Sequence, residues 1–469
     1  MAPDRETIAA IATPKGTGGI AVIRVSGSKA ISASNRIFRG KTSLEAAESG
    51  RLYLGQITQG EKGRSSLVDE VMVSVFRAPR SYTREDVVEI SCHGGEYVSR
   101  RILEVLLLQG IRVALPGEFT ERAFLNGRLD LSQAEAVHDI INAKTRRSLE
   151  SALCQFEGVL SGKVSEIREQ LIGVCSLLEL ELDFAEEDVQ FANRDEVGRR
   201  LASIIADISS FEKTYERGRI YRDGARLVLT GKPNVGKSSL MNALLKSERA
   251  IVTSIPGTTR DTIEEQLDIS GVLFRVVDTA GVRTASDEVE KIGVQRSLKQ
   301  IEMADIVIFI IDGSERLGPQ DFQLLDEVER IRGNSFGSTV ILAINKSDLP
   351  IGLSKEELQK FAGSNQVQRI SAKEMTGFSS LEEKLLSIVE PPGRFTGESA
   401  MVTNLRHREA LLSARADLES AEDSLKQGLS SELLAVDLRG ALHHLGEIIG
   451  EIDTEDILSA IFSKFCIGK

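Results

Sequence analysis

Cysteine is scarce in this chain, and the few that occur lie far apart. They are Cys92, Cys154, Cys175 and Cys466. Four isolated cysteines form neither the disulfide framework of a small secreted protein nor a paired Cys-x-x-Cys zinc site. We therefore expect a protein of a reducing compartment and predict a cytoplasmic location.

Long apolar runs are also missing. A membrane-spanning helix needs about 18 or more apolar residues in succession, whereas the best run here, Ile306 to Ile311, has the length of a buried strand. The first residues, Met1 to Gly16, include Asp4 and Glu6 and lack the apolar core of a secretory signal. The sequence thus predicts neither a membrane partner nor export.

Positive charge is in deficit. The 469 residues contain 58 Lys and Arg against 70 Asp and Glu, and the net charge of −12 disfavours a broad phosphate-binding surface. Apolar residues make up 41% and charged residues 27%, as in globular proteins, so a fibrous or wholly disordered chain is excluded. At about 100–200 residues per domain, the length predicts about three domains.

The hydrophobic pattern changes twice along the chain. Up to about residue 120, short β-rich runs such as Ile20 to Val25 and Val87 to Ser91 alternate with glycine-rich turns, which indicates an α+β unit. From about 132 to 215, apolar residues recur at helical spacing without any proline. Between about 224 and 388, strands alternate with helices, which predicts a parallel sheet covered by helices.

Helical periodicity then returns at residues 404–428 and 431–463. Helical segments on both sides of an α/β unit indicate that this unit is inserted into a helical domain. We predict an α+β domain at residues 1–121, an all-α domain at 122–221 and 391–469, and the inserted α/β domain at 222–390.

The strongest local signal is Gly231-Lys232-Pro233-Asn234-Val235-Gly236-Lys237-Ser238. It fits the pattern GxxxxGK[ST], follows the apolar run Leu227 to Thr230 and opens a predicted helix, which is the context of a phosphate-binding loop. Its amides are expected to face phosphates at a helix N-terminus. Lys237 is expected to reach the β- and γ-phosphates, and the Ser238 hydroxyl to bind Mg²⁺.

The other parts of a guanine-nucleotide site follow in order. Asp278 ends the run Leu273 to Val277 and begins Asp278-Thr279-Ala280-Gly281, so it is expected to hold Mg²⁺ through water. A hydroxyl of Thr258 or Thr259 is expected to complete the Mg²⁺ shell. In Asn345-Lys346-Ser347-Asp348, the carboxylate can accept two N–H groups of guanine, and Ser371-Ala372-Lys373 is expected behind the base.

Val282 stands where small GTPases have the glutamine that orients the attacking water. Another group must therefore assist hydrolysis. Asp287, Glu288 and Glu290 follow in a predicted helix, and their spacing alone does not separate a catalytic acid from solvated charges. The role of Asn234, as a turn residue or a functional one, is likewise open.

Taken together, these motifs and several flanking blocks resemble the MnmE (TrmE) family of tRNA modification GTPases over nearly the whole chain. The flanking blocks are Thr13-Pro14, Gly18–Ile20, Val22–Gly27, His93–Gly95, Pro116–Gly127, Gly257–Asp261, Asp278–Arg283 and Phe465–Lys469. The resemblance implies a folate-binding and dimerising N-terminal domain, a helical domain, and a G domain inserted into the latter.

The resemblance also implies a reaction and its partners. With the flavin-containing protein MnmG (GidA), such enzymes install an aminomethyl-type group, such as carboxymethylaminomethyl, at carbon 5 of the wobble uridine of certain tRNAs. A 5,10-methylene- or 5-formyl-tetrahydrofolate supplies the carbon. The implied folate ligands are Arg24, Glu89, Arg128 and Lys469, of which the last is by its position alone a frayed terminus. Cys466 is implied to lie near this site, where a buried inert thiol is an equal alternative.

For the G domain, the resemblance implies dimerisation around K⁺, held by Asn234, Thr253, Ile255 and Thr258, with Glu290 orienting the water. Pro256 departs from the smaller residue common in that loop. The full set of expected nucleotide contacts is Asn234, Val235, Gly236, Lys237, Ser238, Ser239, Thr253, Ser254, Ile255, Pro256, Gly257, Thr258, Thr259, Asp278, Thr279, Ala280, Gly281, Asn345, Lys346, Asp348, Ser371, Ala372 and Lys373.

Two other functions remain open at this point. One is a regulatory GTPase that acts on ribosomal RNA, and the other is a folate-dependent methyltransferase that works alone with a merely structural G domain. Binding of folate by the first 130 residues would argue against the former, and a need for the flavoprotein would argue against the latter.

Overall fold

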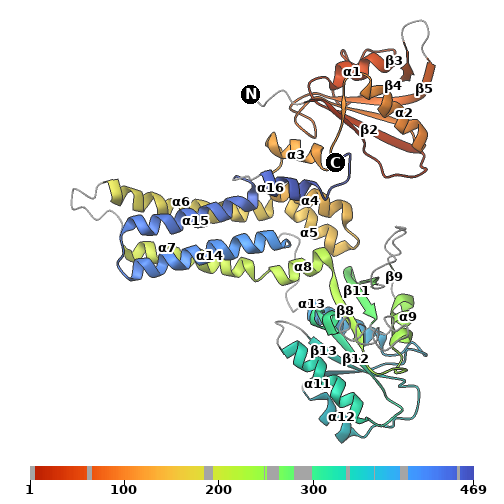
Figure 1. The fold of residues 1–469 in the computed structure, drawn as a ribbon, viewed down its shortest axis with the longest axis vertical. Helices are drawn as coiled ribbons and strands as arrows, with labels where there is room; N and C mark the ends of the chain where they lie inside the picture. Colours follow the sequence, from red (N-terminus) through yellow and green to blue (C-terminus); the bar gives the residue numbers. More distant parts are fainter. Residues whose placement is uncertain are drawn as a thin grey trace, which may run out of the picture. The chain divides into compact units, whose positions relative to one another are not determined.

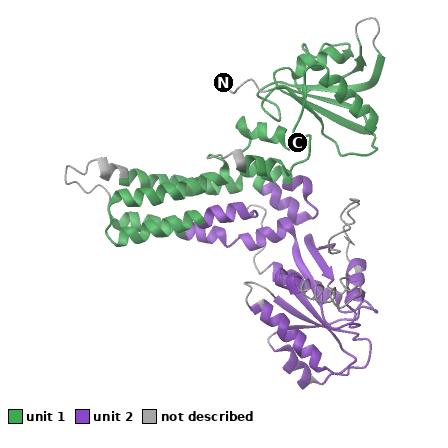
Figure 2. Cartoon of the chain, viewed as in Figure 1, with its two compact units in different colours: residues 1–138, 155–205, 413–469 green, residues 139–154, 206–412 purple. Residues whose placement is uncertain are grey.

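The structure, a computed structural model, describes most of the chain. The described residues are 6–60, 66–183, 194–247, 249–250, 264–278, 298–333, 339–363, 365–390, 400–451 and 455–469. They divide into two compact units (Figure 2): the first comprises residues 1–138, 155–205 and 413–469, and the second residues 139–154 and 206–412.

The first unit contains a seven-stranded sheet in the order β3-β4-β5-β6-β2-β1-β7. Its strands are β1 (Ile8–Ile11), β2 (Ile20–Ser26), β3 (Phe38–Gly40), β4 (Leu52–Gln59), β5 (Ser66–Phe76), β6 (Val87–His93) and β7 (Arg112–Val113). All neighbours pair antiparallel except β1 and β7, which are parallel. The α+β prediction for this region is confirmed.

Side chains of these strands alternate between a covered and an open face, as the two-residue period of a strand requires. The helices α1 (Ala30–Ile37) and α2 (Glu96–Leu107) share one apolar core with Ile23, Val73 and Ile90. Residues one position along, such as Arg24 and Glu89, therefore point to the open face.

The end of the chain returns to this sheet. Pro116 forms an isolated antiparallel bridge with Ile467, and the Phe119 amide donates to the Lys469 carbonyl at 3.3 Å. Gly468 has φ +104°, and a Cβ there would lie 2.5 Å from the carbonyl oxygen of Ile11, so glycine allows this close approach. The alternative of a frayed terminus is wrong.

Helices make up the remainder of the first unit and part of the second. They are α3 (Glu118–Leu125), α4 (Leu131–Asn142), α5 (Arg146–Phe156), α6 (Val159–Asp183), α7 (Arg194–Glu212), α8 (Tyr215–Asp223), α14 (Leu405–Lys426), α15 (Ser431–Ile449) and α16 (Glu455–Phe462). Within the first unit, α6 and α15 lie side by side (Figure 1). The predicted helix at 431–463 is wrong in one respect, because Gly450 adopts a left-handed conformation, φ 79°, and ends α15.

The second unit contains another seven-stranded sheet, in the order β14-β13-β12-β8-β11-β10-β9. Its strands and helices are β8 (Ala225–Thr230), α9 (Lys237–Ser247), β9 (Arg249–Ala250), β10 (Glu264–Ile269), β11 (Val272–Asp278), β12 (Ile306–Asp312), α11 (Pro319–Gly333), β13 (Thr339–Asn345), α12 (Lys355–Ala362), β14 (Gln366–Arg369) and α13 (Phe378–Val389).

The predicted parallel sheet is confirmed for β14, β13, β12, β8 and β11. It is wrong at the edge, where β10 runs antiparallel to both β11 and β9. The turn between β10 and β11 explains this, because Ser270 and Gly271 both have positive φ, 52° and 89°, as a two-residue hairpin turn requires.

The central strands of this sheet are covered on both faces. Every residue of β12 is buried, and successive residues point to opposite faces: Ile308 belongs to one apolar cluster and Phe309 to another. Strands buried on both sides are typical of parallel sheets wrapped by helices, and their carboxyl ends gather loops at one edge. Among the described helices, none combines the length and the apolar character needed to cross a bilayer.

Candidate functional sites

The loop between β8 and α9 has the backbone expected of a phosphate cradle. Gly231 has φ +143°, and a Cβ there would lie 2.3 Å from the Ile310 carbonyl oxygen. Gly236 has φ +100°, and a Cβ there would lie 2.2 Å from Asn345 Nδ2. Both positions therefore require glycine. Asn234 is left-handed, φ 65°, and exposed at the tip of the loop. The loop amides precede α9, whose positive dipole end favours anions.

The ammonium group of Lys237 is held over this loop. It donates to the carbonyl oxygens of Gly231 at 2.8 Å and Lys232 at 2.6 Å, and the residue is only 8% exposed. Lys232 in turn pairs with Asp321 at the start of α11. This ion pair anchors the loop from outside.

Ser238 and Asp278 bring two oxygen ligands together. The Ser238 hydroxyl, in the first turn of α9, donates to Asp278 Oδ2 at 3.0 Å, at the end of β11. A hydroxyl and a carboxylate are hard oxygen donors of the kind that Mg²⁺ takes in small number while it keeps several waters. These two residues fit the predicted metal.

Asn345, at the end of β13, connects two loops that lie far apart in sequence. Its side-chain amide donates to the Val235 carbonyl at 2.8 Å and accepts from the Ala372 amide at 3.0 Å. The residue is 2% exposed, so both bonds form out of contact with water. The phosphate loop and the loop at Ser371 are thereby braced against each other.

Asp348 faces the second of these loops. The Ser371 hydroxyl donates to its carboxylate, and this bond holds the pKa of Asp348 below its usual value. The carboxylate is thus kept charged, which suits it to accept N–H groups. Beside it, Lys346 pairs with Asp312. Burial raises the pKa of Asp312, but the hydrogen bonds from Lys346 and Ser314 outweigh burial and leave that pKa below its usual value.

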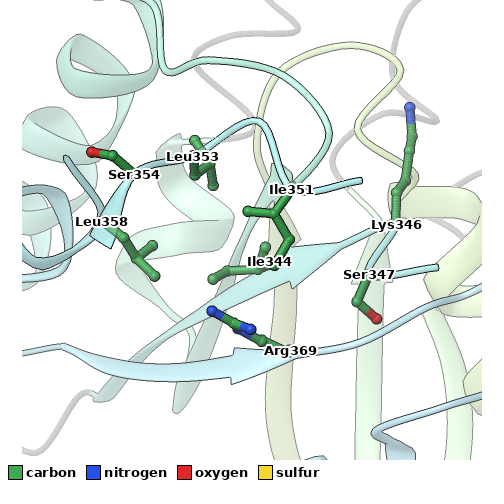
Figure 3. A pocket seen from close by; sticks show the side chains of 9 residues that line it. Ile344, Lys346, Ser347, Ile351, Leu353, Ser354, Leu358 and Arg369 are labelled. Carbon is green, nitrogen blue, oxygen red and sulfur yellow. The ribbon is translucent and has the colours of Figure 1, made fainter. Parts of the chain in front are cut away.

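A small cavity adjoins this loop but is too small for a nucleotide base. Ile344, Ile351, Leu353 and Leu358 gather around it, with Arg369 at its border (Figure 3). Its volume is about 30 Å³, which leaves room for one or two waters at most. The base is therefore expected on the Asp348 and Ser371 side.

Part of the predicted nucleotide set is brought together and part cannot be placed. The described members that converge are Asn234, Val235, Gly236, Lys237, Ser238, Asp278, Asn345, Asp348, Ser371 and Ala372; Ser239 continues α9, and Lys346 and Lys373 flank the base loops. Outside the described residues lie Thr253, Ser254, Ile255, Pro256, Gly257, Thr258, Thr259, Thr279, Ala280, Gly281, Val282 and Glu290.

A second cluster forms on the open face of the first sheet. Arg24 on β2 stands directly opposite Glu89 on β6, and Nη2 of the arginine lies 2.8 Å from the carboxylate. The guanidinium also lies 5.0 Å from the ring centre of Tyr82. Its Nη1 atom is buried without a hydrogen-bond partner among the described residues, which marks a place for an acceptor.

The other two predicted folate ligands are close by. The Phe119 amide donates to the Lys469 carbonyl, and the Arg24 guanidinium lies 5.7 Å from the ring centre of Phe119, so the C-terminus lies at this cluster. Burial lowers the pKa of Lys469, and the charge of Arg24 lowers it further. The guanidinium of Arg128 also lies over the Tyr82 ring, 4.8 Å from its centre, and Arg128 Nη1 donates to the Tyr82 carbonyl at 2.7 Å. All four predicted ligands thus converge. Cys466 is exposed, so the alternative of a buried thiol is wrong.

A cleft of about 470 Å³ opens at this cluster. Its lining comprises Phe76, Pro79, Arg80, Ser81, Tyr82, Arg84, Val87, Glu89 and Arg128. The volume lies in the range of ligand sites, about 300–1,000 Å³. Sequence reasoning missed Arg80, Tyr82 and Arg84; their signal was a basic loop between two strands of an otherwise acidic chain.

Comparison with known proteins gives the family of the chain. The model "MnmE helical domain" matches residues 131–466, and the model "GTP-binding protein TrmE N-terminus" matches residues 7–128. The chain is 44% identical over 467 residues to "tRNA modification GTPase MnmE" of Carboxydothermus hydrogenoformans, with 99% of each chain covered. It is 45% identical over 467 residues to the protein of that name from Syntrophus aciditrophicus, covering 99% of this chain and all of the relative.

Among solved structures, the G domain of the FeoB iron transporter of T. maritima matches 35% of this chain and 99% of its own length, at 29% identity. The TM-score of 0.28 is too low to support an argument about the fold. The two family models and the full-length relatives suffice: this chain belongs to the MnmE (TrmE) family of tRNA modification GTPases.

Proposed function

We propose that the chain hydrolyses GTP at the loops around Asn345 and thereby gates a folate-dependent tRNA modification. The observation that carries the GTPase part is the pair of hydrogen bonds by which the Asn345 side chain joins the phosphate loop to the base loop. Nucleotide phosphates and guanine would then be held by one braced frame. Such fixed positioning is the main contribution of protein to phosphoryl transfer.

Each described residue has a role in this reaction. Lys237 would leave its loop carbonyls for the phosphate oxygens, and the loop amides would bind the charge that builds up on them. Asp348 would accept two N–H groups of guanine, which adenine does not offer, so ATP would leave a charged group unpaired. When bound, Mg²⁺, held by Ser238 directly and by Asp278 through water, would neutralise phosphate charge.

We propose K⁺ as the second cation, held by Asn234 with Thr253, Ile255 and Thr258. In its support, Asn234 lies exposed at the tip of the phosphate loop, where a facing G domain can reach it. A cation there takes the place of an arginine finger. We expect GTP hydrolysis to be at least tenfold faster in KCl than in NaCl, and equal rates would contradict this mechanism.

Glu290 is the proposed water-orienting acid, because Val282 has no polar group for that task. Its replacement by alanine should reduce turnover by about 10²–10⁴-fold, the usual contribution of general acid–base groups. GDP affinity, measured in parallel by fluorescence titration, should stay within about twofold of the parent. Full turnover in the variant would show that another group orients the water.

The cleft at Arg24 and Glu89 is proposed to bind the tetrahydrofolate derivative. The Glu89 carboxylate suits the donor edge of a pterin, and the cations of Arg24, Arg128 and Lys469 suit the glutamate carboxylates. Arg24→Ala should abolish binding of 5-formyltetrahydrofolate in calorimetry. Lys469→Met should weaken binding about tenfold, the value of one charge-assisted bond, whereas Lys464→Met, at an exposed position on the same segment, should not.

The substrate is proposed to be the wobble uridine of certain tRNAs, since the full-length relatives are named tRNA modification GTPases. We propose that the chain, a cytoplasmic enzyme, supplies folate and GTP timing, while the flavoprotein partner MnmG (GidA) supplies most of the basic tRNA surface. The net charge of −12 favours this division. Modification assayed with and without the partner tests it: activity without partner, or tight tRNA binding by this chain alone at physiological salt, would contradict it.

A further inference from the structure

Three exposed arginines border the cleft on the open face of the first sheet, and nothing in the proposed reaction uses all of them. They are Arg80, Arg84 and Arg128. Among the described residues, none of the three forms an ion pair with a carboxylate, although the chain carries more acidic than basic groups. In an acidic protein, unpaired cations gathered at one opening indicate an anionic ligand.

Contacts through Tyr82 and the neighbouring loop connect these cations to Arg24. The Arg24 guanidinium lies 5.0 Å from the ring centre of Tyr82, and that of Arg128 lies 4.8 Å from the same ring centre. Arg84 follows, since its Nη1 donates to the Asn126 carbonyl at 2.9 Å, two residues before Arg128. Arg80 lies on the same loop, with its side chain free of any hydrogen bond to the described residues.

Arginines that lie one after another along a cleft suit a ligand with several separate carboxylates better than a ligand with one compact anionic group. Glu89 already provides for the pterin, and Arg24, Arg128 and Lys469 provide for the first glutamate, as proposed above. A monoglutamate leaves the outer arginines without a partner. Each further γ-linked glutamate adds one carboxylate, which can pair with one guanidinium.

We propose that this cleft recognises the polyglutamate form of the folate, with Arg84 and Arg80 binding the carboxylates beyond the first glutamate. The proposal rests on folate binding at Arg24 and Glu89. An RNA backbone is also polyanionic, but the three arginines line a single cleft of about 470 Å³, the size of a small-molecule site, and the net charge of −12 disfavours a broad phosphate-binding surface. The extended tail also gives a reason for the basic loop, residues 77–86, between β5 and β6.

Calorimetry with the full-length protein tests the proposal, using 5-formyltetrahydrofolate with one or three glutamates. Exposed charge pairs contribute little individually, so two added pairs are expected to make the triglutamate bind about tenfold more tightly than the monoglutamate. This ratio should shrink at high salt because the pairs are exposed. In the double variant Arg80→Gln, Arg84→Gln, the ratio should fall to about one.

Matched controls separate the possible outcomes. Arg100→Gln removes an exposed arginine from α2, on the covered side of the same sheet, and should keep the full ratio. If Arg84→Gln disturbs the loop, Arg80→Gln alone should still halve the ratio or better. Equal affinities in the parent protein, or a tenfold ratio that persists in the double variant, would overturn the proposal.

Two further results are informative in different ways. If tRNA displaces the triglutamate from the parent but not from the double variant, the arginines serve RNA, and the polyglutamate assignment is wrong. If neither folate binds the parent protein, the folate function itself fails. Monoglutamate binding without a chain-length effect leaves that function intact and overturns only the inference.

Discussion

At the scale of single residues, the proposed nucleotide site depends on one buried amide. Asn345 satisfies a carbonyl in the phosphate loop and an amide in the base loop, and both bonds are buried. Lys237 and Asp348 are the residues that would touch the ligand. The loops that carry them are held together by the side chain of Asn345, which the sequence analysis had listed only as a nucleotide contact.

Asn345→Ala should therefore lower both stability and nucleotide affinity. Each buried polar group left without a partner costs about 1–3 kcal/mol, so we expect the free energy of unfolding to fall by about 2–4 kcal/mol. Urea unfolding and GDP titration measure the two effects. Asn365→Ala is the matched control, because its side chain bonds only Glu329 at the surface of the same unit. Unchanged GDP affinity in Asn345→Ala would contradict the bracing role.

At the scale of elements, a chain of charges attaches α3 to the first sheet. Arg122, 2% exposed, donates to Glu118 at 3.0 Å, to Glu85 at 3.0 Å and to the Glu6 carbonyl at 2.8 Å. Arg112 binds Glu118 from the other side. Because Glu85 lies in the loop that carries Tyr82, this network also positions one wall of the cleft proposed to bind folate.

The network predicts a pH dependence of stability. Burial raises the pKa of Glu118, but the bonds from Arg112, the Leu115 amide and Arg122 bring it below its usual value. A group whose folded pKa is lowered stabilises the fold above its unfolded pKa, and this contribution disappears as the pH falls through the folded value. The free energy of unfolding of the first unit should thus decline below about pH 4.5.

Glu118→Gln isolates this contribution. It leaves buried Arg122 with one carboxylate fewer, which should cost about 3 kcal/mol at pH 7, and the acid-dependent decline should become shallower. Chemical unfolding at pH 7 and pH 4 measures both. Glu104→Gln, an exposed partner of Arg101 on α2, is the control and should change stability by less than about 1 kcal/mol. A pH profile identical in Glu118→Gln and the parent would refute the assignment.

At the scale of the whole molecule, the open face of the first sheet exposes large apolar side chains beside Arg24 and Glu89. Leu52, Leu54 and Ile20 are more than 60% exposed, and Met72 stands opposite Leu54 on the next strand. Exposed apolar faces of this kind mark association sites. This face supports the proposed homodimer, in which a second copy would cover the cleft region.

Leu54→Glu with Met72→Glu should convert the dimer to monomers. A carboxylate in an apolar contact loses its hydration without a partner, so we expect the dimer dissociation constant to rise at least about 100-fold. Sedimentation over a range of concentrations measures it. Leu108→Glu, at an exposed position directly after α2, should leave the proposed dimer unchanged. A dimer that survives the double variant would place the interface elsewhere.

Much of the molecule could be predicted from local patterns. The buried strand at Ile306 to Ile311, the helix after the phosphate loop and the α/β insertion all follow from periodicity and turn residues within one segment. The antiparallel β10 was missed because its sequence, Glu264–Ile269, contains only two apolar residues and gives a weak strand signal. Only the positive φ at Ser270 and Gly271 decides its direction.

The sequence by itself determined the chemistry that lies within one turn of chain: the glycines of the phosphate loop, its lysine and serine, and the aspartate proposed to read guanine. Only the tertiary structure decided which distant charges meet. Strand register placed Arg24 opposite Glu89, 65 residues away, and the returning C-terminus brought Lys469 beside them. The physical reason is that a motif encodes its own backbone path, whereas long-range pairing depends on how whole elements bury their apolar faces.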